Sequence, residues 1–268
     1  MKQMYDYIFV VLVYRNTDDL AEFVESVDQK VKNYKIVVVN SYYDETTKNR
    51  ARKLAEDNNC DFINVENKGY SFGNNAGIEY ATEKYSYKYL IVSNPDIVIK
   101  TFDFDPDKKI GDIIAPYIVA ASGKNQNPMV IKRSKASEWL IYHGFKNHSQ
   151  FLLVMGVGIN RIKREVALKI NRDRREYPIY CAHGSFLLIS SDTIKQIGVR
   201  PYDENMFLFA EESVLANLAD KKGLKTVYYD QIQVLHKEDG SMKLGGIAVN
   251  NELAKANIYY YEHYVKGI

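Results

Sequence analysis

An aspartate lies within the apolar stretch at residues 89–99, where Asn94-Pro95-Asp96 separates two runs of strand-forming residues. The first run has no polar alternation, which is typical of a fully buried central strand. Proline cannot donate to a β-ladder and restricts the residue before it, so the strand should end at Asn94. Ligands bind at the carboxyl ends of central strands in open α/β sheets. From the residues alone, the tripeptide is either an ordinary turn or a metal site around Asp96.

Two adjacent carboxylates, Glu211 and Glu212, form a second group that could do chemistry. They open a predicted helix that ends near Gly223, and the apolar residues 206–210 precede them. Apolar surroundings raise the pKa of a carboxyl group, which suits a general base. The alternative is that these carboxylates are surface charges in a first helical turn, where the helix dipole stabilises them.

Two histidines are further candidates. His236 ends a short apolar strand predicted over residues 232–235, and His183 begins the segment His183-Gly184-Ser185. His183 is a candidate wall of a binding pocket. For both histidines, a packed or hydrogen-bonded structural residue is the alternative.

The elements that position these groups alternate between strand and helix. The predicted strands are residues 7–13, 36–39 and 61–65. A helix capped by Thr17 follows the first strand, and a second helix spans residues 44–58 with Leu54 and Ala55 inward. The apolar face of the first helix consists of Leu20, Phe23, Val24, Val27 and Val31. This alternation predicts βαβ units and a parallel sheet whose strands end at one crevice.

Residues 66–77 form a loop rich in glycine and asparagine ahead of a predicted helix. Glycine lets a backbone come close to a phosphate or a sugar, and a helix N-terminus attracts anions. The loop lacks the lysine and hydroxyl ending of a P-loop and the spacing of the dinucleotide fingerprint. Tolerance of a left-handed backbone in a tight loop is the alternative reason for these residues.

The 268-residue chain fits one large domain or one domain with an appendage. Its formal net charge of +2 is too small to indicate nucleic-acid binding. Cys60 and Cys181 match no disulfide or metal spacing and predict free thiols in a reducing compartment. We find neither a signal-peptide pattern nor an apolar run of ~18 residues, so we expect a cytoplasmic protein.

Residues 124–176 carry a local excess of lysine and arginine. The aromatic residues interleaved with them are Trp139, Tyr142, Phe145 and Phe151. Such a stretch lies on an anionic membrane, binds a diphosphate-linked acceptor, or forms a solvated insertion with extended basic side chains. The tyrosine-rich stretch at residues 258–264 predicts a helix that packs on the domain or on a second copy.

Seven segments, taken in this order, resemble glycosyltransferase family 2, the inverting sugar transferases of the GT-A fold. They are YRN, VVVN, ENKGYSFGNNAGI, YLIVSNPD, YCAHGSFLLIS, YDENMFLFAEESVLANLADKKG and VLHKEDGS. The likeness covers residues 5–120 and 178–241.

The resemblance implies an α/β fold, a GT-A-like, Rossmann-type α/β/α sandwich with a mixed, mainly parallel central sheet. Residues 1–241 would form the glycosyltransferase domain and residues 242–268 a C-terminal helical tail. The domain would comprise a nucleotide-sugar-binding part (1–120), a basic aromatic insertion (121–177) and an acceptor-binding part (178–241).

The resemblance also implies roles for individual residues. Donor-binding residues would be Tyr14, Asn16, Asn40, Asn67, Gly69, Asn75, Asn94 and Asp96. Asp96 and His236 would hold Mn²⁺ or Mg²⁺, together with diphosphate oxygens and water. Acceptor-binding residues would be His183, Gly184 and Ser185. Glu212 stands where the family usually has a catalytic aspartate, and its longer side chain leaves Glu211 as the alternative base.

The implied activity is transfer of a sugar from a UDP- or dTDP-type nucleotide sugar to a hydroxyl of a saccharide acceptor. By the same resemblance, the acceptor is lipid-linked, and the setting is bacterial surface polysaccharide or capsule synthesis at the inner face of the plasma membrane. Peripheral membrane contact and a homodimer are further expectations. Asn40 and Asn94 replace family aspartates, which leaves open a non-catalytic nucleotide-sugar-binding module or an inactive partner subunit.

Overall fold

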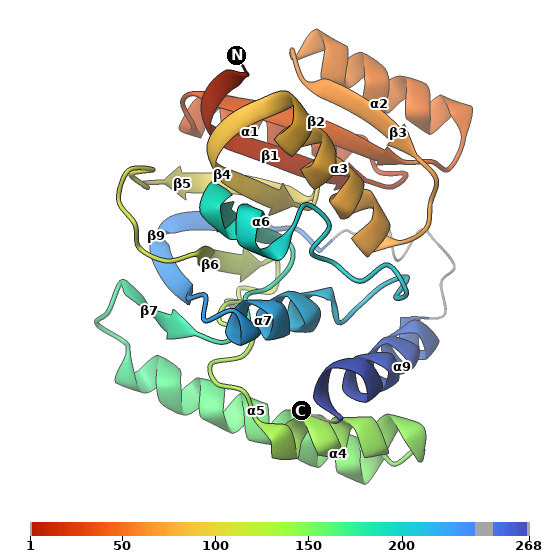
Figure 1. Ribbon diagram of the computed structural model, residues 1–268, viewed down its shortest axis with the longest axis vertical. Coiled ribbons are helices and arrows are strands. Elements are labelled where there is room, and N and C mark those ends of the chain that lie inside the picture. The colour runs from red at the N-terminus through yellow and green to blue at the C-terminus, as the bar shows by residue number, and fades with distance from the viewer. Residues whose placement is uncertain (1, 239–248, 267–268) are drawn as a thin grey trace.

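The computed structural model describes residues 2–238 and 249–266 (Figure 1). The strands are β1 (Gln3–Val13), β2 (Tyr34–Ser41), β3 (Asp61–Val65), β4 (Tyr85–Ser93), β5 (Ile97–Phe102), β6 (Ile113–Ala120), β7 (Glu176–Ile179), β8 (Phe186–Ser190) and β9 (Thr226–His236). The helices are α1 (Asp18–Lys30), α2 (Glu45–Asp57), α3 (Tyr70–Lys84), α4 (Lys135–Lys146), α5 (Gln150–Ile170), α6 (Ser191–Ile197), α7 (Glu211–Lys221) and α9 (Val249–Tyr260), followed by a π-helical turn η1 (Tyr261–Val265).

All nine strands belong to one sheet with the order β3-β2-β1-β4-β8-β6-β9-β5, and β7 pairs with β9. The first four strands of this order are parallel, and β8 joins β4 in the antiparallel direction. Val13 pairs with Asn40 across β1 and β2, and Val11 pairs with Ser93 across β1 and β4. The carboxyl ends of β1, β2 and β4 therefore lie at one edge of the sheet, as the sequence predicted.

Helices cover both faces of the sheet. The buried apolar faces of α1 and α2 pack on one side, whereas α3, α6 and α7 pack on the other. The predicted α/β/α sandwich with a mixed sheet is thus confirmed. All five apolar residues expected on the face of α1 are buried.

The starts of α1 and α2 show which side chains cap each helix. Thr17 occupies the N-cap position of α1, but its side chain makes no capping bond. Instead the backbone N–H groups of Asp18 and Asp19 donate to Asn16 Oδ1 over 3.2 and 3.4 Å, so the expected cap by Thr17 is wrong. Asp44 does cap α2, because its side chain accepts from the Thr47 N–H over 2.7 Å.

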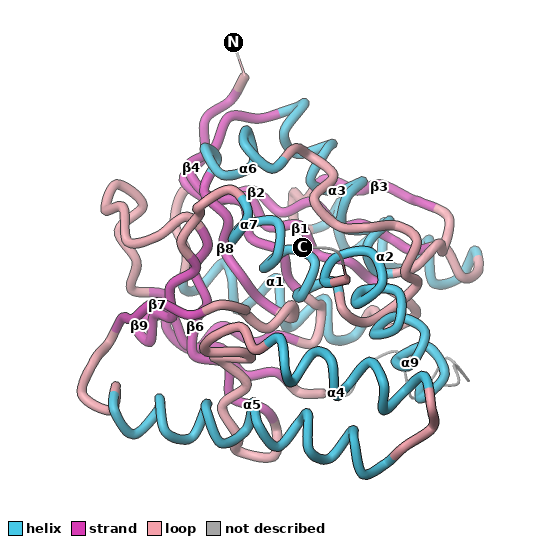
Figure 2. The backbone as a smooth tube through the Cα atoms, turned by 60° about the horizontal axis from the view of Figure 1, so that its bottom comes forward, coloured by secondary structure: helices cyan, strands magenta, loops and turns pink. Residues whose placement is uncertain are grey.

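The basic segment forms a helical hairpin of α4 and α5 at one end of the molecule, and α9 packs against α4 (Figures 1 and 2). Ser137 Oγ donates to the Gly156 carbonyl over 2.7 Å and joins the two helices of the hairpin. Gly156 permits this contact, because a Cβ there would lie 2.7 Å from Ile141 Cγ1. Among the helices that the structure describes, none combines the length and the apolar character needed to cross a membrane.

Candidate functional site

The turn between β4 and β5 places Asp96 next to His236, from the last residue of β9. The strand pairing aligns His236 with Ile97 on β5 and with Ala120 on β6. Both side chains are nearly buried, and Asp96 Oδ2 lies 3.3 Å from His236 Nε2. Sheet topology therefore brings together two predicted metal ligands that are 140 positions apart in the numbering.

Gln126 determines which nitrogen of His236 carries a proton. Its Nε2 donates to Glu238 Oε1 over 2.9 Å, so its Oε1 is the atom that faces His236 Nδ1 at 2.8 Å. Nδ1 must then donate, which leaves a lone pair on Nε2 of the neutral ring. That lone pair faces the Asp96 carboxylate, and two acceptors at this distance need a proton or a cation between them.

A divalent cation fits this pair. A carboxylate oxygen and an imidazole nitrogen are ligands for Mn²⁺, and a partner that fixes the histidine tautomer is the usual second shell of such a site. Within residues 2–238 and 249–266, no group of three or more His, Cys, Asp or Glu side chains could hold a metal. The remaining ligands would have to be donor phosphate oxygens or water.

Residues 183–185 connect this pair to the acidic helix. The Asn94 N–H donates to the Ser185 carbonyl over 2.9 Å, and the rings of His183 and His236 are 5.8 Å apart. The Gly184 N–H donates to Glu212 Oε1 over 3.3 Å. A Cβ on Gly184 would lie 2.8 Å from the same oxygen, so glycine allows the approach of Glu212.

The histidine of this segment is held neutral. Burial, together with the neighbouring His236, lowers the pKa of His183 to about 4. Its ring Nδ1 accepts from the Ser185 N–H over 3.2 Å, and the backbone N–H of His183 donates to Asn127 Oδ1 over 2.8 Å. His183 is therefore a rigid, uncharged wall beside the Asp96–His236 pair.

Glu211 and Glu212 begin α7 after two residues with left-handed backbones, Phe209 (φ 75°) and Ala210 (φ 64°). Glu211 is 3% exposed, and burial together with the charge of Glu212 raises its pKa to about 8. Burial also raises the pKa of Glu212. The sequence-based expectation of raised carboxyl pKa values is confirmed.

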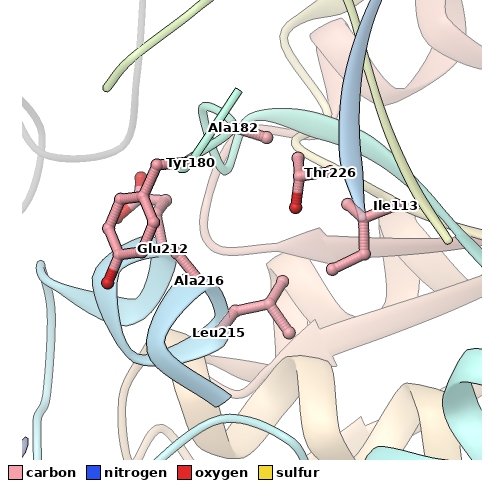
Figure 3. Close-up of a pocket in the computed structure, with 7 residues that line it drawn as sticks. All are labelled: Ile113, Tyr180, Ala182, Glu212, Leu215, Ala216 and Thr226. Carbon is pink, nitrogen blue, oxygen red and sulfur yellow. The ribbon is translucent and has the colours of Figure 1, made fainter. Parts of the chain in front are cut away.

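Glu212 differs from Glu211 in what it faces. It lines a small pocket with Tyr180, Ala182 and Thr226 (Figure 3). Glu211 Oε1, in contrast, is buried and has no hydrogen-bond partner among the described residues. Of the two carboxylates, Glu212 is the one that lines this pocket.

A second, larger cavity, lined in part by polar side chains, adjoins the first and shares Tyr180 with it. It lies between α4, α5, α7 and α9, and Ser213 lines it from the residue after Glu212. Three of its buried polar atoms have no hydrogen-bond partner in the described part of the chain: Arg133 Nη2, Asn160 Oδ1 and Tyr180 Oη. Unpaired buried polar groups are costly, so this cavity is suited to a polar occupant.

At the carboxyl end of β2, Asn40 is fully buried. Its Nδ2 donates to Asn64 Oδ1 over 2.7 Å, whereas its Oδ1 accepts no hydrogen bond from the described residues. Tyr14 lies edge-on to Tyr43 with ring centres 5.9 Å apart, and the Arg15 guanidinium is 3.7 Å from the centre of the Tyr43 ring. An orphan acceptor and a pair of aromatic rings therefore lie at the ends of adjacent strands.

Most of the remaining residues that were predicted to bind the donor make hydrogen bonds or close contacts that fix the local backbone. Asn16 starts α1, and Asn67 Oδ1 accepts from Ser41 Oγ over 3.1 Å. Gly69 (φ 104°) lies against the Phe207 backbone, where a Cβ would be 2.2 Å from the carbonyl oxygen. Asn75 is fully buried and donates to the Tyr202 carbonyl and to Glu204, each over 2.8 Å. Asn75 thus fastens α3 to the loop before α7.

Sequence reasoning missed Gln126, Asn160 and Lys237. Lys237 binds Asp19 over 2.9 Å and also Glu22, and so ties the end of β9 to α1. Its position directly after His236 was a usable signal. Gln126 and Asn160 lie in no motif, and only the folded chain brings them to the site.

Comparison with known proteins agrees with this arrangement. Residues 8–103 match the model of the family described as Glycosyl transferase family 2. A curated relative, the low-salt glycan biosynthesis hexosyltransferase Agl10 of Haloferax volcanii, is 22% identical over 172 residues, which is 64% of this chain and 50% of the relative. The chain thus spans about half the length of this curated relative.

Solved structures share the fold at low sequence identity. GalNAc-T7 with UDP, GalNAc and Mn²⁺ matches with a TM-score of 0.59 and 10% identity over 87% of this chain and 44% of that chain. TarS of S. aureus matches with a TM-score of 0.56 and 10% identity over 87% and 36%. The mannosyltransferase PcManGT from Pyrobaculum calidifontis, in complex with GDP-Man and Mn²⁺, gives 0.54 and 11% over 98% and 73%. Residues 8–103 are thus similar to glycosyltransferase family 2, and the chain shares the GT-A fold of these solved structures.

Proposed function

We propose that this protein transfers a sugar from a nucleotide diphosphate sugar to a hydroxyl of a saccharide acceptor, with inversion at the anomeric carbon. The observation that carries the proposal is the short segment 183–185. It contacts the Asp96–His236 pair at one end and the Glu212 carboxylate at the other. The candidate cation-binding pair therefore lies on one side of segment 183–185, and the candidate base lies on the other.

The donor would lie along the carboxyl ends of β1, β2 and β4. Asn40 Oδ1, which lacks a partner among the described residues, could accept from the imide N–H of a uracil or thymine base. Tyr14 would flank the base, and Asp96 with Asn94 would be next to the diphosphate. A UDP- or dTDP-sugar is the proposed donor. UDP accompanies one structural neighbour, and GDP-Man accompanies another.

The chemistry would be a single displacement. Glu212 removes the proton from the acceptor hydroxyl as that oxygen forms a bond to the anomeric carbon, and the bond from that carbon to the diphosphate oxygen breaks. The nucleoside diphosphate leaves with the bonding electron pair. Asp96 and His236 would hold Mn²⁺ or Mg²⁺, whose charge offsets the negative charge growing on the diphosphate.

The acceptor would enter beside Glu212, with His183, Gly184 and Ser185 as one wall. The polar cavity that contains Arg133 and Asn160 continues from this region. Hydroxyl groups of a saccharide would satisfy its orphan donor and acceptors, and the rings of Tyr180 and Tyr260 offer stacking surfaces. We further propose a lipid-linked acceptor, used in surface polysaccharide assembly at the inner face of a membrane.

The test is Glu212→Gln, which keeps the size of the side chain but removes the base. Transfer from a panel of UDP-, dTDP- and GDP-sugars should fall by roughly 10² to 10⁴ fold, the usual contribution of a general base. Donor binding, measured as the rise in melting temperature with UDP and Mn²⁺, should stay near that of the unmodified protein.

Glu56→Gln, at an exposed position of α2, is the matched control and should retain full transfer. Retained turnover in Glu212→Gln would show that Glu212 is not the base. A second candidate function rests on the asparagines at positions 40 and 94, which replace family aspartates. If the unmodified protein binds these donors but neither hydrolyses nor transfers any of them, it is a nucleotide-sugar-binding module and not an enzyme.

A further inference from the structure

Helix α5 is the least buried long element of the described structure. Only Gly156 among its 21 residues is buried. Figure 2 shows α5 along the outer edge of the molecule, with α4 on its inner side and no element on the other. Seven large apolar side chains of α5 are exposed: Phe151, Val154, Met155, Val157, Ile162, Val166 and Ile170.

Four of these side chains form a continuous outward stripe. Phe151, Met155, Ile162 and Val166 are 71%, 44%, 67% and 51% exposed. At 100° per residue they fall within a sector of about 60° on the helix surface. The face of α5 that packs on α4 lies outside this sector and includes Gly156, where a Cβ would meet Ile141 and Leu140. We call these four residues the α5 stripe.

The inner face of α5 belongs to the core of the protein. Asn160 lines the polar cavity beside α7, and Arg164 donates to the carbonyls of Pro128 and Asn125. The α5 stripe is therefore not needed for packing within the described chain. Clustered exposed apolar side chains on one helix indicate a surface that another protein or a membrane covers.

The charges around the α5 stripe indicate what kind of surface it binds. Residues 132–176 contain 11 lysines and arginines against four aspartates and glutamates. On the helix, Arg161 and Lys163 project on either side of the α5 stripe, and Lys169 continues it toward the C-terminal end. Three more basic residues follow: Arg172, Arg174 and Arg175. In the described part of the chain, none of these six cations forms an ion pair.

Two copies of this surface would place their basic rims against each other, which like charges oppose. A surface of acidic phospholipids attracts the rim and accepts the apolar stripe, and this combination defines an interfacial amphipathic helix. We propose that α5 docks on an anionic membrane surface, with the α5 stripe at the level of the lipid headgroups and the basic residues on their phosphates.

The docking surface does not depend on the proposed sugar transfer. Its position adds a consequence that does rest on the proposed function. Because the opposite face of α5 contributes Asn160 to the polar cavity beside Glu212, the saccharide of a lipid-linked acceptor could reach that cavity from the same membrane.

The proposal is tested by sedimentation of the full chain with vesicles of phosphatidylcholine, with and without phosphatidylglycerol. The unmodified protein should sediment with the anionic vesicles and stay in solution with the neutral ones, and added salt should weaken its binding. Phe151→Ser with Ile162→Ser should abolish sedimentation. Failure of the unmodified protein to bind anionic vesicles at low salt would overturn the proposal.

A matched pair of charge variants separates α5 from general basicity. Arg161→Gln, Lys163→Gln and Lys169→Gln together should weaken partitioning on the order of 100-fold. The control combines Lys53→Gln, Lys108→Gln and Lys221→Gln, three exposed lysines elsewhere in the chain, and should bind like the unmodified protein. Equal losses in both triple variants would contradict docking through α5.

Two further readouts distinguish the other outcomes. If the protein is a dimer by light scattering and Phe151→Ser with Ile162→Ser makes it a monomer, the stripe is a contact between copies and the membrane proposal is wrong. Hydrolysis of the nucleotide sugar in solution, without vesicles, should be unchanged in the stripe variant. Loss of vesicle binding with intact hydrolysis therefore tests the docking surface separately from the proposed activity.

Discussion

Glu211 and Glu212 are neighbours in the sequence but have different surroundings in the fold. Glu212 accepts from the Gly184 N–H and lines a pocket, whereas Glu211 is buried with one oxygen that has no partner among the described residues. A buried carboxyl without a partner favours its protonated form. The raised pKa of Glu211 follows from this environment, and it makes the acidic helix start a source of pH-dependent stability.

We expect Glu211→Gln to stabilise the protein at pH 8. The unfolded state loses the Glu211 proton near pH 4.5, whereas the folded state holds it until about pH 8. Between these values the folded state binds more protons, so the free energy of unfolding falls as pH rises. Thermal melts of both proteins between pH 5 and pH 8 should show a flatter pH dependence and a higher melting temperature at pH 8 for the variant. Glu56→Gln should keep the original slope, and a lower melting temperature for Glu211→Gln at pH 8 would contradict this account.

At the scale of elements, loops do more than strands and helices to position the candidate site residues. Residues 181–185, between β7 and β8, connect Glu212 to the Asp96–His236 pair. The loop before α7 ends in two left-handed residues, Phe209 and Ala210. Left-handed backbone is unfavourable for residues with a Cβ, and such conformations gather at functional sites.

Ala210→Gly should therefore raise the free energy of unfolding by about 1 kcal/mol, because glycine adopts φ near 64° without the steric cost. Ala136→Gly, at an exposed position of α4, is the control of opposite sign and should lower it by about 1 kcal/mol. Urea unfolding of the three proteins measures both changes. Destabilisation by Ala210→Gly would mean that the left-handed backbone at this position costs little.

Periodicity in the sequence was sufficient for the regular elements. The apolar spacing of α1, the β3 boundaries and the break at Asn94-Pro95-Asp96 are found as predicted. The strand of His236 is longer than expected, because Thr226–Tyr229 extends it to pair with β6 and β7. Gln126 could not be assigned from the sequence, because it lies in no periodic or motif-bearing segment. Tyr180 begins the segment YCAHGSFLLIS, but nothing in that segment indicated a role for the tyrosine. Gln126 is hydrogen-bonded to His236, 110 positions away, and Tyr180 lines a pocket together with Glu212, 32 positions away.

Over the whole molecule, the candidate cation site depends on both halves of the chain. Asp96 follows β4 in the first half of the chain, and His236 ends β9, the last strand in sequence among the described residues. Lys237 continues from His236 and binds Asp19 on α1, which holds the end of β9 against the first half. Binding of a cation by Asp96 and His236 would therefore depend on the correct position of β9 against the first half of the chain, as well as on the two side chains.

Gln126→Leu tests this arrangement without touching either proposed ligand. Loss of the Gln126 carbonyl removes the acceptor that keeps the proton on His236 Nδ1, so Nε2 no longer presents its lone pair in a fixed direction. We expect the apparent affinity for Mn²⁺, measured as the Mn²⁺ dependence of the melting temperature in the presence of UDP, to fall by about 10-fold or more. Gln233→Leu, at an exposed position of β9, should leave the apparent affinity for Mn²⁺ unchanged.

EDTA should return the unmodified protein to its metal-free melting temperature. An unaltered Mn²⁺ dependence in Gln126→Leu would show that the His236 tautomer is set by another group, and a melting temperature that never responds to Mn²⁺ would remove the metal role of Asp96 and His236.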